Sequence, residues 1–199
     1  MNRLPRAARI GFTLWMLFWV PLIWWAYGPQ NFFWLCNAAQ FLVLYAVWTD
    51  HRLLLSSQAC AVTVVGIAWT LDFLPGLLLG GSPLGITAYM WDEELHLAAR
   101  IASIYHIALP VFLILCLRYT GYDRRGPWLQ SGLGALILLA GWWLTEPERN
   151  INWMFEPFGV EQVWMPEPVY ILLALVLYPL VLYFPAHFLL RRILRRMSG

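Results

Sequence analysis

Two side chains in this sequence, a cysteine and a histidine, are of types that together perform covalent catalysis. Cys36 lies in "NFFWLCNAAQFLVLY" and His106 lies in "ASIYHIALP". An imidazole within reach removes the thiol proton, the thiolate attacks a carbonyl carbon, and the imidazolium then protonates the leaving group. Asn37, Gln40 or Asn152 could orient the imidazole or donate a hydrogen bond to the oxyanion. The competing interpretation is that Cys36 packs as a small hydrophobe and that His106 makes a structural hydrogen bond.

The composition indicates that these side chains belong to an integral membrane protein. Of the 199 residues, 61% are hydrophobic and 12% are charged, and apolar stretches recur along the whole chain. A helix needs ~20 residues to cross a hydrocarbon core of ~30 Å. We therefore predict an all-α bundle, a single domain over residues 1–199, with six transmembrane helices at about 10–27, 32–48, 53–74, 97–117, 128–144 and 168–190.

The arginines predict the orientation of this bundle, because cytoplasmic loops of membrane proteins are rich in basic residues. The chain has no lysine, and all but Arg100 and Arg149 of its 13 arginines fall in segments that share one side of a six-span chain. Both termini are therefore predicted to be cytoplasmic. The opposite side carries most of the acids in two long segments, which we expect to fold over the outer mouth of the bundle. The net charge of +2 gives no reason to expect nucleic-acid binding.

This topology predicts that polar side chains of three spans share one depth, in the outer half of the membrane. At ~1.5 Å of rise per residue, Cys36 and His106 lie ~7 Å and ~13 Å along spans that enter from outside. Asp72 is the only acid clearly inside an apolar span, and it lies toward the same side. Polar groups in a bilayer face a cavity or one another, so Asp72 joins the supporting candidates. Pro110 lacks the N–H that would bond the carbonyl of His106, so we expect the helix to bend or open there.

No metal, cofactor or disulfide is expected from the remaining polar residues. "DEELH" places Asp92 and His96 four residues apart, which is a conceivable metal-ligand spacing, but acids in the first turn of a helix also stabilise its N-terminus, and that role is favoured. Cys60 and Cys116 are predicted to lie at other depths, without polar neighbours, and to act as packing residues. His187, near the inner end of the last span, is interpreted as an interfacial residue without chemistry.

Two short motifs and the span pattern resemble a known superfamily. "WLCNAAQ" followed about seventy residues later by "IYHIALPVFLI" is similar to the androgen-induced and androgen-dependent membrane hydrolases, which cleave fatty-acid esters of hydroxy fatty acids. Their catalytic Thr matches Cys36, and their catalytic His matches His106. A Cys at the first position looks like the branch with the transmembrane ether-phospholipid acyltransferase and bacterial relatives, which also carry a segment similar to "NINWMFEP". The resemblance implies Cys36 as nucleophile and His106 as base.

We therefore predict an intramembrane lipid acyl hydrolase or acyltransferase that acts on a membrane lipid near the outer leaflet. A thioester passes its acyl group to an alcohol as readily as to water, so hydrolysis and transfer both stay open. Arginine without lysine is compatible with a GC-rich bacterial gene, which places the protein in a bacterial inner membrane with the site toward the periplasm. The alternatives are a non-catalytic accessory subunit with membrane-protein partners and a small-lipid binding protein.

Overall fold

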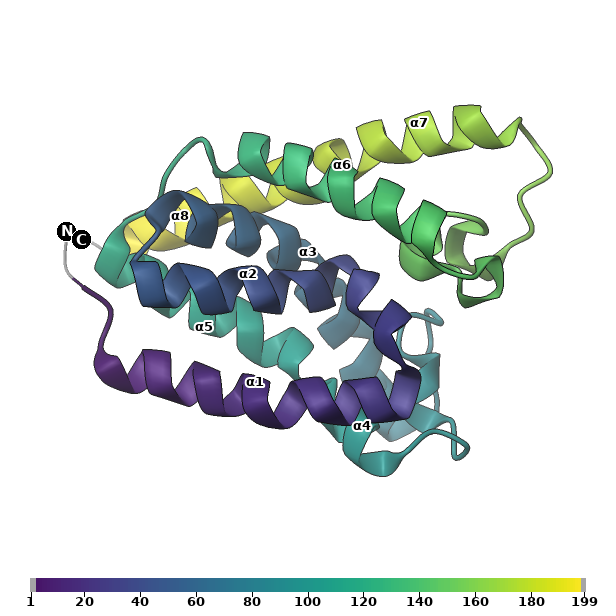
Figure 1. Ribbon diagram of the computed structural model, residues 1–199, viewed down its shortest axis with the longest axis horizontal. Helices are drawn as coiled ribbons and strands as arrows, with labels where there is room; N and C mark the ends of the chain where they lie inside the picture. The colour runs from purple at the N-terminus through teal and green to yellow at the C-terminus, as the bar shows by residue number, and fades with distance from the viewer. Residues whose placement is uncertain (1–2, 198–199) are drawn as a thin grey trace.

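The computed structural model describes residues 3–197, and within that range every regular element is helical. The prediction of an all-α fold is thus confirmed. Short 3-10 turns and one π-turn join the longer segments (Figure 1), which are α1 (Arg6–Tyr27), α2 (Leu35–Thr49), α3 (Arg52–Leu79), α4 (Leu97–Ala102), α5 (Tyr105–Thr120), α6 (Gly126–Leu144), α7 (Glu167–Tyr178) and α8 (Phe184–Met197).

Within residues 3–197, four helical segments are long and apolar enough to cross a membrane, which indicates an integral membrane protein. They are Arg6–Tyr27, Arg52–Leu79, Leu97–Thr120 and Glu167–Met197. The 15-residue α2 is apolar but shorter. Helices occupy all six predicted positions, with different bounds: α3 continues through Pro75 to Leu79, and the last segment passes through a π-turn at Pro179–Tyr183. Proline has no N–H to give to the preceding turn, which accounts for the irregular geometry at Pro179.

Helix α3 is the centre of the bundle and packs against α2, α5, α6 and α8. Figure 1 shows α1 on one side of this centre, with α6 and α7 on the other. Gly66 lets α3 approach α5 closely, because a β-carbon there would lie 2.4 Å from the carbonyl oxygen of His106 and 2.7 Å from Cγ of Pro110. Small residues play this role in membrane bundles, where backbones must approach for helices to pack. The contact fixes the depth of His106 relative to α3.

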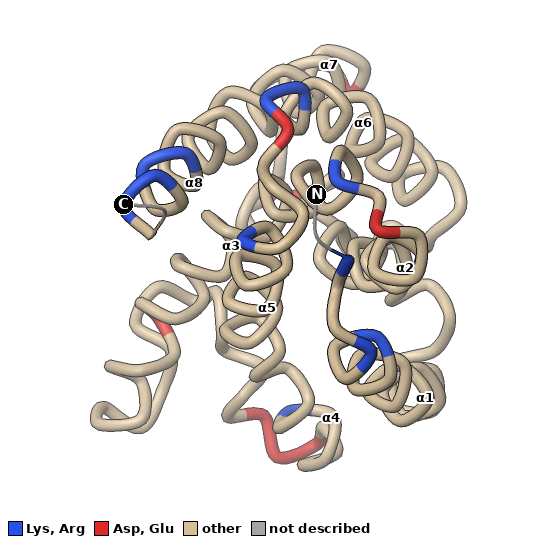
Figure 2. Tube along the Cα trace, turned by 90° about the vertical axis from the view of Figure 1, so that its left-hand side faces the viewer, with Lys and Arg blue, Asp and Glu red and all other residues tan. Residues whose placement is uncertain are grey.

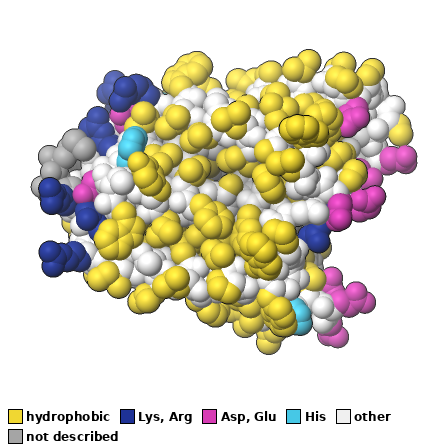
Figure 3. Space-filling view, in the orientation of Figure 1, with side chains coloured by type: hydrophobic (Ala, Val, Ile, Leu, Met, Phe, Trp, Pro, Cys, Tyr) yellow, Lys and Arg dark blue, Asp and Glu magenta, His cyan; other side chains and the backbone are white. Residues whose placement is uncertain are grey.

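Charged side chains lie at opposite ends of the bundle. Figure 3 shows arginines at one end, acidic side chains at the other and a belt of hydrophobic side chains between them, and Figure 2 views the arginine-rich end. Two aspartates at that end are paired with arginines: Asp50 with Arg9 at 2.5 Å, and Asp123 with Arg125 at 2.9 Å. Hydrogen bonds from Arg125 lower the pKa of Asp123 to about 2. We call the two ends the arginine end and the acidic end.

Two long connecting segments lie at the acidic end (Figure 1). Residues 80–96 follow α3 and contain the 3-10 turn Ala88–Trp91, and residues 145–166 precede α7 and contain the turn Ile151–Trp153. Asp72 is fully buried and holds the first of these segments. Its carboxylate accepts hydrogen bonds from Ser82 Oγ at 2.5 Å, the Leu84 amide at 2.6 Å, and the Thr87 amide and hydroxyl at 2.7 and 2.8 Å.

Candidate functional site

Cys36 and His106 line one cavity of about 470 Å³ near the acidic end of the bundle. Cys36 comes from the first turn of α2 and His106 from the first turn of α5. Trp69 of α3 and the connecting segments complete the wall, the latter with Tyr89 and Trp153. We call this space the Cys36–His106 cavity. The structure therefore places Cys36 and His106, seventy positions apart in the sequence, in the wall of one cavity.

Asn37 connects Cys36 through hydrogen bonds to Tyr105, the residue before His106. Its side-chain oxygen accepts from the Tyr105 hydroxyl at 2.5 Å and from the Cys36 thiol at 3.9 Å. Its amide nitrogen donates to the backbone oxygen of Asn31 at 2.8 Å. Because Tyr105 directly precedes His106, Asn37 holds the start of α2 against the start of α5. Asn37 is thus a positioning residue, since both ends of its amide are used in these contacts.

His106 has one ring nitrogen fixed by the backbone. Its Nδ1 lies 2.8 Å from the carbonyl oxygen of Ser103. A carbonyl oxygen can only accept, so Nδ1 carries the proton and Nε2 presents a lone pair, the tautomer that a general base requires. The ring is stacked between Tyr105, at a centroid distance of 4.1 Å, and Trp69, at 5.3 Å. These contacts orient the imidazole within the cavity wall.

The helix carrying His106 is interrupted directly before it rather than at it. Helix α4 ends at Ala102, α5 begins at Tyr105, and the His106 amide bonds the Ser103 carbonyl at 3.0 Å in a tighter turn. The bend that the sequence predicts at His106 is therefore displaced by three residues. The carbonyl of His106 faces Gly66 instead of a polar partner, while the Ser103 carbonyl receives both the His106 amide and its ring.

Asn152 fixes the start of α2 without facing His106. Its side-chain oxygen accepts from the Leu35 amide at 2.8 Å, and its nitrogen donates to the Phe33 carbonyl at 2.8 Å. Its own backbone is left-handed, with φ of 54°, a conformation that Asn adopts more readily than most residues. Asn152 therefore caps the helix one residue before Cys36 and sets the position of the thiol from 116 residues away.

Gln40 and Asp72 do not line the Cys36–His106 cavity. The side-chain oxygen of Gln40 accepts from Trp15 Nε1 at 2.6 Å, and the residue faces a different space, between α1 and α5. The oxygens of Asp72 accept hydrogen bonds from the 80–87 segment. Asp72 does not touch the cavity itself, but it holds the segment that leads to Tyr89 in the cavity wall. Neither residue is placed to orient His106, which corrects the direct orienting role expected from the sequence.

Four residues of the site were not foreseen from the sequence. Tyr105 and Ser103 lie on either side of the helix interruption, and the pattern Ser-x-x-His at i and i+3 is the signal that could have identified Ser103. Trp69 donates from Nε1 to the Tyr89 hydroxyl at 2.9 Å. Burial raises the pKa of Tyr89 to about 12, so its hydroxyl keeps its proton and can donate it into the cavity.

A second cysteine has polar neighbours, contrary to the expectation from the sequence. Cys60 Sγ lies 3.2 Å from the Tyr122 hydroxyl, which lies 2.7 Å from Nδ1 of His187. Cys60 and His187 therefore both take part in a buried hydrogen-bond chain. Among residues 3–197, no three His, Cys, Asp or Glu side chains gather as metal ligands would. The acids of "DEELH" precede α4 and are absent from its first turn, so the capping role expected for them is wrong.

Comparisons with protein-family models, with curated proteins and with solved structures find no match to this chain. The class that the fold defines is a helical membrane protein, and the residues at its acidic end form a Cys/His site beside a cavity.

Proposed function

We propose that the protein is an intramembrane lipid acyl-transfer enzyme with six transmembrane spans, in which Cys36 is the nucleophile and His106 the base. One observation carries the proposal: Cys36 and His106 line a single cavity, and Asn37 bonds both Cys36 and Tyr105, whose ring stacks on His106. In the membrane, the arginine end faces the cytoplasm with both termini, and the cavity lies toward the outer leaflet of a bacterial inner membrane.

The first half of the reaction transfers an acyl group from a lipid ester to Cys36. Nε2 of His106 takes the thiol proton, and the thiolate sulfur bonds to the ester carbonyl carbon. The bond between that carbon and the alkoxy oxygen then breaks, and the imidazolium returns its proton to the departing alcohol. The Tyr89 hydroxyl, held by Trp69, is the candidate donor to the oxyanion that forms between these steps.

The second half transfers the acyl group from the thioester to an acceptor. His106 removes a proton from an alcohol or from water, the acceptor oxygen bonds to the acyl carbon, and the carbon–sulfur bond breaks. The proton then returns to Cys36 and restores the thiol. An alcohol acceptor gives a new ester and water gives a fatty acid, so hydrolysis and transfer differ only in what enters the cavity.

The polarity of the cavity matches a reaction at a lipid headgroup more than a purely structural role. Its wall combines the Cys36 thiol, the His106 imidazole and the Tyr89 hydroxyl with aromatic rings. A bundle interior that served packing alone would gain nothing from a space of about 470 Å³ beside its polar side chains. The resemblance of "WLCNAAQ" and "IYHIALP" to membrane ester hydrolases supports the same assignment of roles.

The test is to trap the thioester on the full-length protein in lipid nanodiscs. The substrate is a glycerolipid ester with an alkyne-tagged acyl chain, and hydroxylamine-sensitive label on the protein is measured. The wild type should be labelled at Cys36, Cys36→Ala should not be labelled, and His106→Ala should be labelled more slowly by roughly 10²–10⁴-fold. Cys60→Ala is the matched control and should behave as wild type.

Two results would contradict the proposal. One is equal labelling of Cys36→Ala and wild type, which would place the acyl group elsewhere. The other is a wild type that is folded, as judged by its melting transition, and yet forms no thioester and turns over none of a series of glycerolipid, sterol and fatty-alcohol esters.

A further inference from the structure

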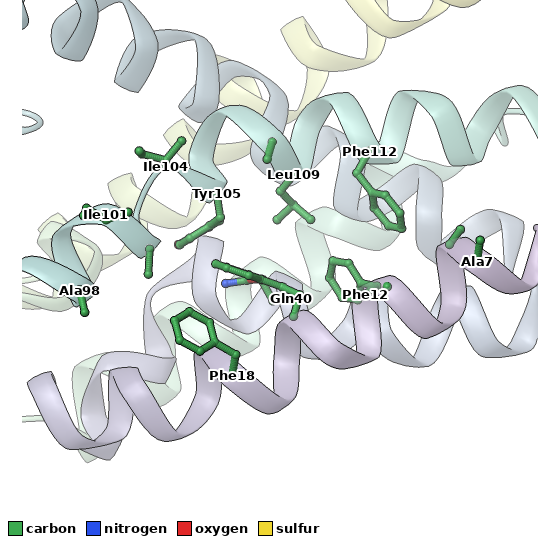
Figure 4. Close-up of a pocket in the computed structure, with 15 residues that line it drawn as sticks. Ala7, Phe12, Phe18, Gln40, Ala98, Ile101, Ile104, Tyr105, Leu109 and Phe112 are labelled. Atoms are coloured by element: carbon green, nitrogen blue, oxygen red, sulfur yellow. The ribbon is translucent and has the colours of Figure 1, made fainter.

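A second cavity, of about 770 Å³, opens between α1 and the pair α4 and α5 (Figure 4). We call it the α1–α5 groove. Small side chains create the space, namely Ala7, Ala8 and Gly11 on α1 and Ala98, Ala102 and Ala108 on the facing helices. Its volume falls within the ~300–1,000 Å³ of sites that hold small molecules.

The walls of the groove are almost entirely hydrocarbon. Phe12 and Phe112 stack with ring centroids 5.0 Å apart and bridge α1 to α5. Phe18, Ile101 and Ile104 form an exposed rim, with 56%, 54% and 41% of their surfaces accessible. A polar ligand would lose its hydration without compensation against such walls, so the occupant they favour is an alkyl chain.

One polar group interrupts this apolar lining. Gln40 has 0% of its surface exposed, and Nε2 has no hydrogen-bond partner. The amide orientation is fixed, because Trp15 Nε1 can only donate and therefore requires the oxygen of Gln40 at 2.6 Å. The unpaired group is thus a donor, and Figure 4 shows the Gln40 side chain among the groove residues. A buried donor without an acceptor is costly, which indicates that a ligand supplies the acceptor.

Tyr105 connects the groove to the Cys36–His106 cavity, because it lines both spaces. Its hydroxyl bonds Asn37 beside the thiol, while its ring packs edge-on against Trp19 at 5.8 Å. On α2, Gln40 lies one turn, ~5.4 Å, farther from the acidic end than Cys36. A chain in the groove would therefore pass within about one helical turn of the thiol.

We infer that the α1–α5 groove binds one alkyl chain of a membrane lipid and that an oxygen attached to this chain accepts a hydrogen bond from Gln40 Nε2. An ester carbonyl, an ether oxygen or a hydroxyl supplies the required acceptor, and a plain hydrocarbon does not. The further statement that this chain belongs to the lipid that reacts at Cys36 rests on the proposed function. Gln40 is then a binding residue that selects a chain bearing oxygen.

The experiment uses two photoreactive probes on the full-length protein in nanodiscs. Both probes carry the same diazirine-bearing chain, which ends in a methyl ester in one and in a methyl group in the other. Cross-linked residues are mapped by peptide mass spectrometry. The ester probe should label the segments 6–27 and 97–120 more than the hydrocarbon probe does, by roughly two- to tenfold for one hydrogen bond.

Three variants test the residues that define the groove. Gly11→Leu fills the groove, and it should fold because a β-carbon at Gly11 meets no atom within 4 Å. Gly132→Leu is the matched control, since Gly132 is likewise an open helical glycine, on α6. Labelling of both segments should fall at least tenfold in Gly11→Leu and stay unchanged in Gly132→Leu. In Gln40→Met, labelling by the ester probe should fall to the level of labelling by the hydrocarbon probe.

The outcomes separate this inference from the proposed function, because groove labelling needs no chemistry at Cys36. Groove labelling in Cys36→Ala equal to that of wild type is expected. If the groove is labelled and no Cys36 thioester forms, lipid binding in the groove is supported and the proposed enzyme activity is rejected. If a thioester forms and the groove is not labelled, the enzyme activity is supported and lipid binding in the groove is rejected. Equal labelling by both probes in every variant would overturn the inference. So would a Gly11→Leu protein that changes only its oligomeric state, since a second copy would then occupy the groove.

Discussion

Two regions of this molecule combine a cysteine, a tyrosine and a histidine, and they differ in what surrounds the thiol. Near the acidic end, Cys36 is partly exposed in a cavity and bonds Asn37, which also binds Tyr105. In the other region, Cys60 is fully buried in α3 and lies 3.2 Å from the Tyr122 hydroxyl. Residue types do not distinguish the two regions, and hydrogen-bond contacts alone would favour the second, whose three groups form a continuous chain.

Access for a substrate differs between the two groups of residues. In the buried chain, Tyr122 stands between Cys60 and His187, and its bond to Nδ1 of His187 is 2.7 Å long. The Tyr122 hydroxyl lies within hydrogen-bond distance of both Cys60 Sγ and His187 Nδ1, so the chain joins α3 to α8. In the Cys36–His106 cavity, the thiol has only a long contact of 3.9 Å to Asn37 Oδ1, and the lone pair on Nε2 of His106 is left for a ligand.

The sharpest test of this difference is the rate of thiol alkylation. A membrane-permeant maleimide should modify Cys36 at least tenfold faster than Cys60 or Cys116, because the latter two are 0% and 2% exposed and react only after local opening. The rates are followed by mass spectrometry of the intact protein and its peptides. His106→Ala should slow modification of Cys36 alone. Cys60 reacting as fast as Cys36 would remove the distinction between the two regions.

The next largest effect is expected from Asn152, which fixes the start of α2. Asn152→Ala leaves the Leu35 amide and the Phe33 carbonyl without partners, so the free energy of unfolding should fall by about 1–3 kcal/mol. The measurement is the melting transition in detergent. Cys36 alkylation should also change, because the first turn of α2 is no longer held. A variant with wild-type stability and wild-type alkylation would show that the cap does not position the thiol.

The sequence predicted the helix positions well, because a hydrocarbon core imposes apolar runs of a fixed length. It could not predict where α2 begins, since that boundary depends on Asn152, which is distant in the sequence and reaches Leu35 only in the folded chain. This cap explains why the predicted range 32–48 matches α2 only approximately. The length of an apolar run limits the length of a helix, whereas capping contacts determine the residue at which the helix starts.

The sequence identified the residue types of the site but not where every polar side chain points. Cys36 and His106 line one cavity, and their common depth in the membrane stays a prediction. Gln40 was expected to orient the imidazole or to bond the oxyanion, yet its oxygen accepts from Trp15 of α1 and the residue lines the α1–α5 groove. Asp72 bonds a loop whose donors, Ser82 and Thr87, give no recognisable local signal. Depth follows from span counting, but the partner of each polar group depends on the packing of several helices.

The smallest expected effect comes from removing one hydroxyl in each region. Tyr105→Phe keeps the ring that stacks on His106 and removes the hydrogen bond to Asn37, so the Asn37 oxygen is left to the Cys36 thiol alone. A stronger bond to the thiol proton stabilises the thiol over the thiolate, and the alkylation rate of Cys36 should fall by roughly two- to tenfold. Tyr122→Phe is the matched control, because it removes the hydroxyl beside Cys60. It should leave Cys36 unaffected and Cys60 still slow, since Cys60 is limited by access. A Tyr122→Phe protein in which Cys60 alkylation rises to the rate of Cys36 would show that hydrogen bonding, and not burial, protects the inner thiol.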